Sequence, residues 1–213
     1  RFCRLLRSPE YQAFNQTPIL VVSATFSGEE AARITADLGA DAFLTSPIDA
    51  GQFIKHVRIL LGGERSQQQL RVLIVEDSKT LTGILKKVFD AHGYRTETVL
   101  TVTAAVAAFG KSGWDVAVID YHLPDGHGDT LLHDFRAQQP DCVCIMMTTD
   151  PAPGLALSWM KKGAAAYLRK PFAPGYLIEL CVKTRRERAL LRVQDLLEMR
   201  TQELRESEER FRR

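Results

Sequence analysis

The sequence lacks several features that would place a protein in a specialised class. Its 213 residues contain no apolar run approaching the roughly 18 to 20 residues that a membrane-spanning helix needs. The net charge is only +2, so there is no general case for direct binding to nucleic acid. The four cysteines, Cys3, Cys142, Cys144 and Cys181, show no paired metal-ligand spacing, and buried thiols suit a reducing compartment. We therefore expect a cytoplasmic protein with no membrane segment.

The clearest internal pattern is a repeat of a four-element unit. Residues 19–61 match residues 144–183, with Gly39 aligned with Gly163. Each copy is typical of strand, helix, strand and helix. A segment as short as the first copy is too small to form a complete sheet with its own core, and its edge strand would be left uncovered. We therefore interpret residues 1–62 as the C-terminal half of a domain. The chain starts without methionine, and we expect it to be a piece of a longer protein.

The second half of the chain holds a complete set of strand-and-helix units. The expected strands cover residues 72–75, 95–99, 114–119, 142–147 and 165–169. The expected helices between the first four strands cover residues 79–91, 103–109 and 130–138. Helical spacing is clearest in the first of them, where the apolar residues are Leu81, Ile84, Leu85, Val88 and Phe89. Five such units imply an α/β fold, a doubly wound parallel sheet with helices on both faces.

Four of these strands end on residue types suited to phosphoryl chemistry. The residues are Glu76 with Asp77, Asp120, Thr148 and Lys170. In an open parallel sheet the carboxyl ends of the strands meet in one crevice, so we expect these side chains to share a site. Lys170 would place its ammonium, and Thr148 its hydroxyl, on phosphoryl oxygens. Taken singly, an acid at the end of a strand is often only a helix cap, and a Lys-Pro pair is often only a turn. Chance is a poor explanation for all of these residues occurring in order, each after an apolar run.

Asp120 is the expected nucleophile of this site. It ends an apolar strand and is followed by residues 121–128, a loop with a turn-forming proline and two glycines. A carboxylate can form an acyl phosphate when the charges are countered, and Mg2+ with oxygen ligands does this. We expect Asp77 and Asp120 to bind Mg2+ directly. The backbone carbonyl of His122 would be a third ligand, and Glu76 would act through water.

These motifs resemble those of the response-regulator receiver family. The resemblance covers Arg71 to about Arg185 and, in part, Ile19 to Gly62. It rests on Val75-Glu76-Asp77, Asp120-Tyr121-His122-Leu123-Pro124-Asp125-Gly126, Met147-Thr148-Thr149 and Lys170-Pro171-Phe172. It implies a flavodoxin-like sheet with strand order 2-1-3-4-5. It also implies a bacterial, cytoplasmic two-component protein that takes a phosphoryl group on Asp120 from a histidine kinase or phosphotransfer protein, with Mg2+ at Asp77.

The resemblance further implies that Thr148 and Tyr167 are switch residues that repack on phosphorylation. One departure is the run from Asp150 to Gly154, whose two prolines and glycine are expected to shorten or delay the helix after the fourth strand. The first copy departs further, since Ser46 stands where Lys170 stands in the second. A serine supplies no charge, so the first copy is expected to be impaired as a phosphate switch.

The segment after Pro174 is expected to be helical to the end of the chain. Leucines recur every seven residues, and the seam consists of Leu190, Val193, Leu197, Leu204 and Phe211. This spacing favours a weak coiled coil, hence a parallel homodimer, over a single exposed helix. Residues 204–212 resemble the lead-in to a PAS domain.

The sequence thus divides into four expected segments: residues 1–62, an incomplete receiver-like half; 63–70, a linker; 71–183, a complete receiver; and 184–213, a helical linker. The expected function is that of a phosphoacceptor that relays a change along the C-terminal helix, without being an enzyme as the chain stands. The alternative is a phosphorylation-independent docking or dimerisation module of a hybrid histidine kinase or cyclic-dinucleotide synthase. A haloacid-dehalogenase-type phosphatase is disfavoured, because His122 stands where its second acid would be.

Overall fold

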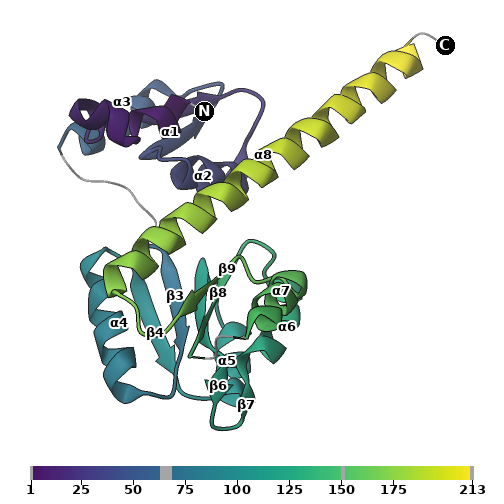
Figure 1. Cartoon of the computed structure of the whole chain (residues 1–213). Coiled ribbons are helices and arrows are strands. Elements are labelled where there is room, and N and C mark those ends of the chain that lie inside the picture. Colours follow the sequence, from purple (N-terminus) through teal and green to yellow (C-terminus); the bar gives the residue numbers. More distant parts are fainter. Residues whose placement is uncertain (1, 63–68, 150–151, 212–213) are drawn as a thin grey trace. The chain divides into compact units, whose positions relative to one another are not determined.

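A computed structural model describes residues 2–62, 69–149 and 152–211 of the chain (Figure 1). It divides into two compact units, one formed by Arg1–Gln67 with Arg186–Arg213 and the other by Gln68–Arg185. Most of the expected linker, residues 63–68, lies outside the described residues.

The second unit is built on a five-stranded parallel sheet. Its strands are β3 (Arg71–Val75), β4 (Arg95–Val99), β5 (Val116–Asp120), β8 (Val143–Thr148) and β9 (Ala166–Arg169). Their order across the sheet is β4-β3-β5-β8-β9, and every neighbouring pair is parallel. Numbered within this unit, the order is 2-1-3-4-5, so the predicted fold is confirmed.

Helices cover both faces of this sheet (Figure 1). They are α4 (Lys79–Ala91), α5 (Val102–Phe109), α6 (Leu131–Gln138), α7 (Pro153–Lys162) and the start of α8 (Pro174–Phe211). One apolar cluster joins α4 and α8 to the sheet and another joins α5, α6 and α7 to the opposite face. Within α4, Leu85 and Phe89 are buried as their spacing predicts, but Ile84 is exposed. The inner strands β3, β5 and β8 are buried from both sides, which explains their nearly continuous apolar sequences, whereas the edge strands β4 and β9 are partly exposed.

The expected shortening of the helix after β8 is not seen when the two copies are compared. Both α7 and its counterpart α2 (Gly28–Asp37) have 10 residues. Pro153 stands at the start of α7, where the missing N–H would have no partner within the helix. Asp150 and Pro151 lie outside the described residues.

The first unit contains the first copy of the repeat. Its elements are α1 (Phe2–Leu6), the 3-10 helix η1 (Pro9–Phe14), β1 (Leu20–Ser23), α2, β2 (Ala42–Thr45) and α3 (Ala50–Leu61). Leu20 pairs with Ala42 in the first copy and Ile145 with Ala166 in the second, so the registers correspond. Among the described residues β1 pairs only with β2, whereas its counterpart β8 is paired on both edges.

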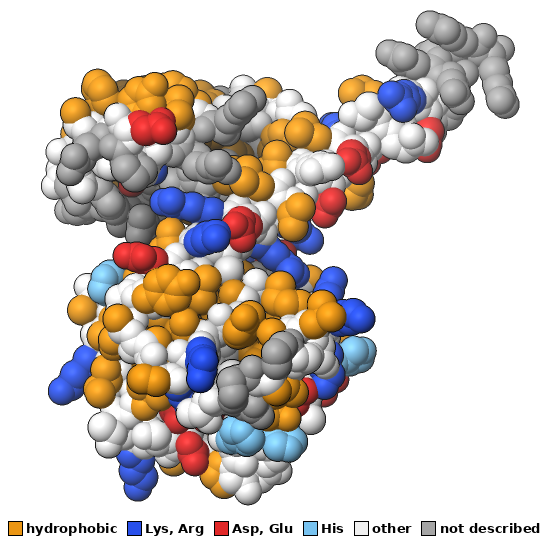
Figure 2. All heavy atoms as spheres, in the orientation of Figure 1, with side chains coloured by type: hydrophobic (Ala, Val, Ile, Leu, Met, Phe, Trp, Pro, Cys, Tyr) orange, Lys and Arg blue, Asp and Glu red, His pale blue; other side chains and the backbone are white. Residues whose placement is uncertain are grey.

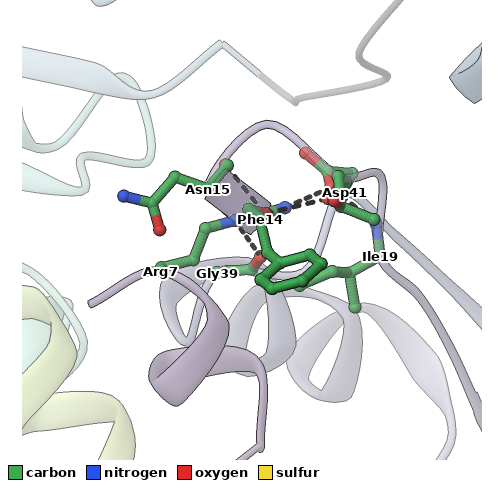
Figure 3. Close-up of polar contacts among 7 residues, drawn as sticks. Arg7, Phe14, Asn15, Ile19, Gly39 and Asp41 are labelled. Carbon is green, nitrogen blue, oxygen red and sulfur yellow. Dashed lines mark hydrogen bonds and ion pairs between the residues drawn. The ribbon is translucent and has the colours of Figure 1, made fainter. Parts of the chain in front are cut away.

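A buried ion pair attaches the N-terminal segment to this first copy (Figure 3). The Arg7 guanidinium donates to Asp41 Oδ2 at 2.6 Å and, through Nε, to the carbonyl of Gly39 at 3.1 Å. The same Asp41 oxygen accepts from the N–H of Ile19 at 2.8 Å, at the start of the first strand. Gly39 has a φ of +98°, and a Cβ there would lie only 2.8 Å from Arg7 Cγ, so a glycine is required.

The helix α8 continues for 38 residues. Its later part carries hydrophobic side chains on the surface among charged side chains of both signs (Figure 2). The seam residues Leu197 and Leu204 are 50% and 61% exposed, and the side chain of Phe211 lies outside the described part. None of the described helices combines the length and apolar character needed to cross a membrane.

Candidate functional site

Three carboxylates meet at the carboxyl edge of the five-stranded sheet. Val75 pairs with Ile119 in the β3–β5 register, so the residues that follow them, Glu76 and Asp120, lie side by side. Glu76, Asp77 and Asp120 each offer a carboxylate oxygen, and these oxygens lie within 4.8 Å of one another. Glu76 is 1% exposed and Asp120 6%, while Asp77 is exposed. The structure therefore brings together the three acids that the sequence placed at strand ends.

Lys170 supplies a positive charge to this cluster. Its Nζ lies 2.6 Å from Glu76 Oε2 and 2.9 Å from Asp120 Oδ2. Lys170 directly follows β9, and its N–H donates to the carbonyl of Thr148 at 2.7 Å, which fixes its backbone at the sheet edge. Burial raises the pKa of the Glu76 carboxyl, and the hydrogen bond from the Lys170 ammonium opposes this shift without cancelling it.

Of the remaining residues predicted for the site, only Thr148 is brought to the end of a strand beside the acids among the described residues. Asp120 is opposite Met147 in the β5–β8 register, so Thr148, the next residue of β8, ends its strand beside the acids. Thr148 is buried. Tyr167 lies on β9 with half of its surface exposed and is not part of the acidic cluster. His122 is exposed in the loop that follows Asp120.

This loop has a structure that its sequence does not indicate. It folds as a short antiparallel hairpin of β6 (His122–Leu123) and β7 (Gly126–His127), followed by a 3-10 turn, η2 (Gly128–Thr130). A Cβ on Gly128 would lie 2.0 Å from the carbonyl oxygen of Asp120, so only glycine allows the loop to return so close to the end of β5. The turn-forming residues had suggested a loop but not its return path.

Asp125 attaches the loop to α5, a contact that the sequence does not predict. Its carboxylate accepts hydrogen bonds from the backbone N–H groups of Val102 and Thr103 at 2.7 and 2.9 Å. It also accepts one from the Thr103 hydroxyl at 2.8 Å. A carboxylate at the first turn of a helix satisfies amides that have no partner within the helix. The sequence Pro124-Asp125-Gly126 signals a turn, but nothing local to it indicates which helix Asp125 reaches.

The donor set suits a hard divalent cation. All three acidic groups offer oxygen, the ligand that Mg2+ prefers, and Lys170 is the cation that the structure shows within hydrogen-bond distance of two of them. A phosphoryl group brought to Asp120 would add further negative charge to a site that already holds three carboxylates. The arrangement can therefore hold a divalent cation and, with it, an anionic phosphoryl group.

An open parallel sheet with acids and a lysine at its carboxyl edge is a doubly wound α/β domain with its polar site where such folds bind ligands. Residues 72–181 match the family model described as "Response regulator receiver domain", and the chain belongs to this family. Its sequence is 32% identical over 106 residues to the transcriptional regulatory protein RprY of Bacteroides fragilis, covering 50% of this chain and 45% of that protein. It is 32% identical over 111 residues to the photosynthetic apparatus regulatory protein RegA of Rhodobacter capsulatus, covering 52% and 58% respectively.

Solved structures agree with this assignment. A CheY-like response regulator receiver domain protein from Methanospirillum hungatei has a TM-score of 0.55 and 27% identity, covering 57% of this chain and 97% of that one. The beryllofluoride-activated NtrC4 receiver domain dimer has a TM-score of 0.53 and 29% identity, covering 55% and 98%. The chain spans about half the length of the curated relatives it matches.

Proposed function

We propose that the second unit is a phosphoacceptor, in which Asp120 takes a phosphoryl group from a histidine kinase or phosphotransfer protein in the bacterial cytoplasm. The observation that carries this proposal is the contact of 2.9 Å between Asp120 Oδ2 and Lys170 Nζ, inside a cluster of three carboxylates. Membership of the receiver family supports it. We infer acceptance by the domain itself rather than turnover of a separate substrate, so the chain as it stands is not assigned as an enzyme.

The transfer requires one bond to form and one to break. A carboxylate oxygen of Asp120 attacks the phosphorus of a phosphohistidine, and the bond between phosphorus and the imidazole nitrogen breaks. The electron pair of that bond stays on the imidazole, which takes up a proton. In this proposal the Lys170 ammonium and the Thr148 hydroxyl bind phosphoryl oxygens, so catalysis is positioning and charge stabilisation.

Asp77 and Asp120 are proposed as direct ligands of Mg2+, with the His122 carbonyl as a third ligand and Glu76 acting through water. When bound, the ion would supply positive charge against the carboxylates and the phosphoryl oxygens. The chain's own contribution is to hold the acids within 4.8 Å of one another before the ion arrives. This preorganisation avoids rearrangement when the charge of the phosphoryl group enters the site.

The proposal is tested by incubating the chain with acetyl phosphate or beryllofluoride and Mg2+. Mass spectrometry should show a phosphoryl adduct with acetyl phosphate, and 19F NMR a bound beryllofluoride signal. Asp120→Asn should abolish both. Asp129→Asn is the matched control, because Asp129 lies in the same loop region but pairs with Lys162, away from Lys170. Absence of any adduct on the unmodified chain, or an undiminished adduct on Asp120→Asn, would refute the proposal.

A second candidate function is docking or dimerisation that does not depend on phosphate. The exposed seam leucines of α8 favour it, as does the first copy, which has Ser46 in the place of Lys170. One of the similar structures is described as a dimer of a beryllofluoride-activated receiver. Sedimentation of the chain with and without beryllofluoride separates the two functions: a phosphate switch predicts a change that Asp120→Asn removes. The PAS-like lead-in at residues 204–212 stays a prediction from sequence.

A further inference from the structure

The hairpin that follows Asp120 places two histidines directly opposite each other. His122 and His127 are partners in the register of β6 with β7. The neighbouring residues, Tyr121 and Gly128, are joined by a hydrogen bond from the Gly128 N–H to the Tyr121 carbonyl at 2.9 Å. Hydrogen-bonded and non-hydrogen-bonded pairs alternate along an antiparallel ladder, and the second kind holds its side chains closer together. His122 and His127 therefore form the closer kind of pair, with both side chains on one face of the hairpin.

The spacing of the two imidazole rings suits a shared metal ion. Their centroids lie 5.7 Å apart. Two imidazoles that bind one tetrahedral zinc ion through Zn–N bonds of about 2.0–2.1 Å have their ring centres roughly 5 Å apart. Both histidines are exposed, so small rotations of their side chains would close the difference without a change in the backbone.

The rings of the other three histidines are engaged within the chain. Nδ1 of His56 and Nδ1 of His92 lie 2.8 and 2.7 Å from carbonyl oxygens one turn earlier in the same helix. Nδ1 of His133 lies 3.2 Å from a carboxylate oxygen of the next residue. Among the residues that the structure describes, no hydrogen bond or ion pair engages the rings of His122 and His127. Their nitrogens are therefore available to a ligand.

The backbone that carries these rings is held in place before any ion binds. The Asp125 carboxylate, at the turn of the hairpin, accepts from the N–H groups of Val102 and Thr103 at the start of α5. The His127 ring stacks on that of Tyr121, with centroids 4.6 Å apart and an interplanar angle of 10°. Stacking occupies the face of an imidazole and leaves the nitrogens at its edge accessible. A preformed site loses less conformational freedom when a ligand binds.

The chemistry of this pair differs from that of the acid cluster. Imidazole nitrogens suit divalent transition ions such as Zn2+, whereas carboxylates and carbonyls suit Mg2+. We propose that His122 and His127 form a second metal site, which binds Zn2+ or a similar transition ion through one nitrogen of each ring and completes the coordination with water. The site does not depend on phosphoryl transfer to Asp120, because it uses none of the clustered carboxylates.

The test uses the whole chain labelled with 15N-histidine, in excess Mg2+ so that the acid cluster is supplied with the ion it prefers. Zn2+ is added stepwise, and the ring nitrogens are followed by long-range 1H–15N NMR. The sequence has five histidines, and His122→Gln and His127→Gln assign the two hairpin signals by removing one each. We expect these two signals to shift together, with the same Zn2+ concentration at half-saturation.

Either substitution should raise the Zn2+ concentration at half-saturation for the remaining ring by at least about tenfold, because two ligands held on one backbone bind an ion more tightly than one. Both residues are exposed, so neither substitution should disturb folding. His133→Gln is the matched control, since it removes an exposed histidine outside the hairpin and should leave this concentration unchanged.

Three outcomes would overturn the proposal. The two hairpin signals could respond at different Zn2+ concentrations, or one could respond unchanged after the other histidine is removed; either result shows independent rings. Loss of both shifts in Asp77→Asn would show that the ion binds at the acid cluster instead. Joint shifts that persist in Asp77→Asn and require both histidines support the site.

Discussion

The ammonium nitrogen of Lys170 lies 2.9 Å from Oδ2 of Asp120, joining the end of the last strand of the sheet to the end of the middle one. The same nitrogen is 2.6 Å from Glu76, so one cation serves two buried carboxylates. Asp77 adds a third negative charge. The cluster therefore carries more acid than its lysine can neutralise, which matters for both activity and stability.

Replacing Lys170 by serine reproduces in the second copy what Ser46 does in the first. We expect labelling of Asp120 by acetyl phosphate to slow by roughly 100-fold, because a preorganised charge on the phosphoryl oxygens is lost. The rate of adduct formation, followed by mass spectrometry, measures this. Lys162→Ser is the matched control, since Lys162 pairs with Asp129 and not with the acid cluster. Equal rates in the two variants would contradict the role given to Lys170.

Asp77→Asn should stabilise the chain when no divalent cation is present. It removes one of three carboxylates whose oxygens lie within 4.8 Å, and mutual repulsion is relieved. Because Asp77 is exposed, solvent screening limits the gain to about 1 kcal/mol. Urea unfolding without Mg2+ measures it, and adding Mg2+ should reverse the order by stabilising the unmodified chain more. An unchanged midpoint in both conditions would show that Asp77 is neither repelled nor a ligand.

The meeting of the strand-end residues in one site could be predicted from the sequence. In a parallel sheet the carboxyl ends of the strands lie at the same edge, so assigning the strands is enough to bring these residues together. Once five parallel strands are assigned, register alone puts Glu76 beside Asp120, and the Lys-Pro pair follows the last strand. The repeat could also be predicted from the sequence. Gly39 and Gly163, which the repeat aligns, both adopt a positive φ in the structure. At the strand ends and at the aligned glycines, the local sequence pattern and the topology of the sheet predict the same structure.

Contacts between elements distant in sequence could not be predicted in the same way. Asp125 caps α5, and Trp159 packs between Tyr121 and Tyr167, but no periodicity indicates which elements touch. The two prolines and the glycine of residues 150–154 predict a shorter or delayed helix, but α7 is as long as α2. Pro153 stands in the first turn of α7, where a proline costs no hydrogen bond. Ile84 shows that helical spacing alone does not bury a residue.

Asp125→Asn should loosen the loop that carries the site, and its effect should depend on pH. Hydrogen bonds from the Thr103 and Val102 N–H groups lower the pKa of the Asp125 carboxyl below 3.8. A lowered folded-state pKa means that the stabilisation is present above pH 3.8 and is lost as pH falls through the folded-state value. The melting temperature of the unmodified chain should therefore exceed that of Asp125→Asn at neutral pH, and the difference should close as the pH falls through the folded-state pKa of Asp125, below 3.8. A difference in melting temperature that does not change with pH would exclude the charged Asp125 carboxylate as its cause.

Cys181 should resist alkylation in the folded chain. Burial raises the pKa of its thiol to about 12. The thiolate fraction at pH 8 is then on the order of 10⁻⁴, and the thiolate is the reactive form. Cys3 is partly exposed and serves as the internal control. Iodoacetamide labelling read by peptide mass spectrometry should modify Cys3 first and Cys181 only when urea unfolds the domain. Equal labelling rates without urea would show that Cys181 is accessible.

Leu204→Glu should weaken self-association of the chain if α8 pairs through its leucine seam. Leu204 is 61% exposed in the single chain, and burying a leucine in a dimer contributes about 1.5–3 kcal/mol. Replacing it by a charged residue should therefore raise the dimer dissociation constant by at least about tenfold. Sedimentation equilibrium measures this change. Gln202→Glu introduces the same charge outside the seam and should leave the constant unchanged. If both substitutions act alike, net charge rather than the seam controls association.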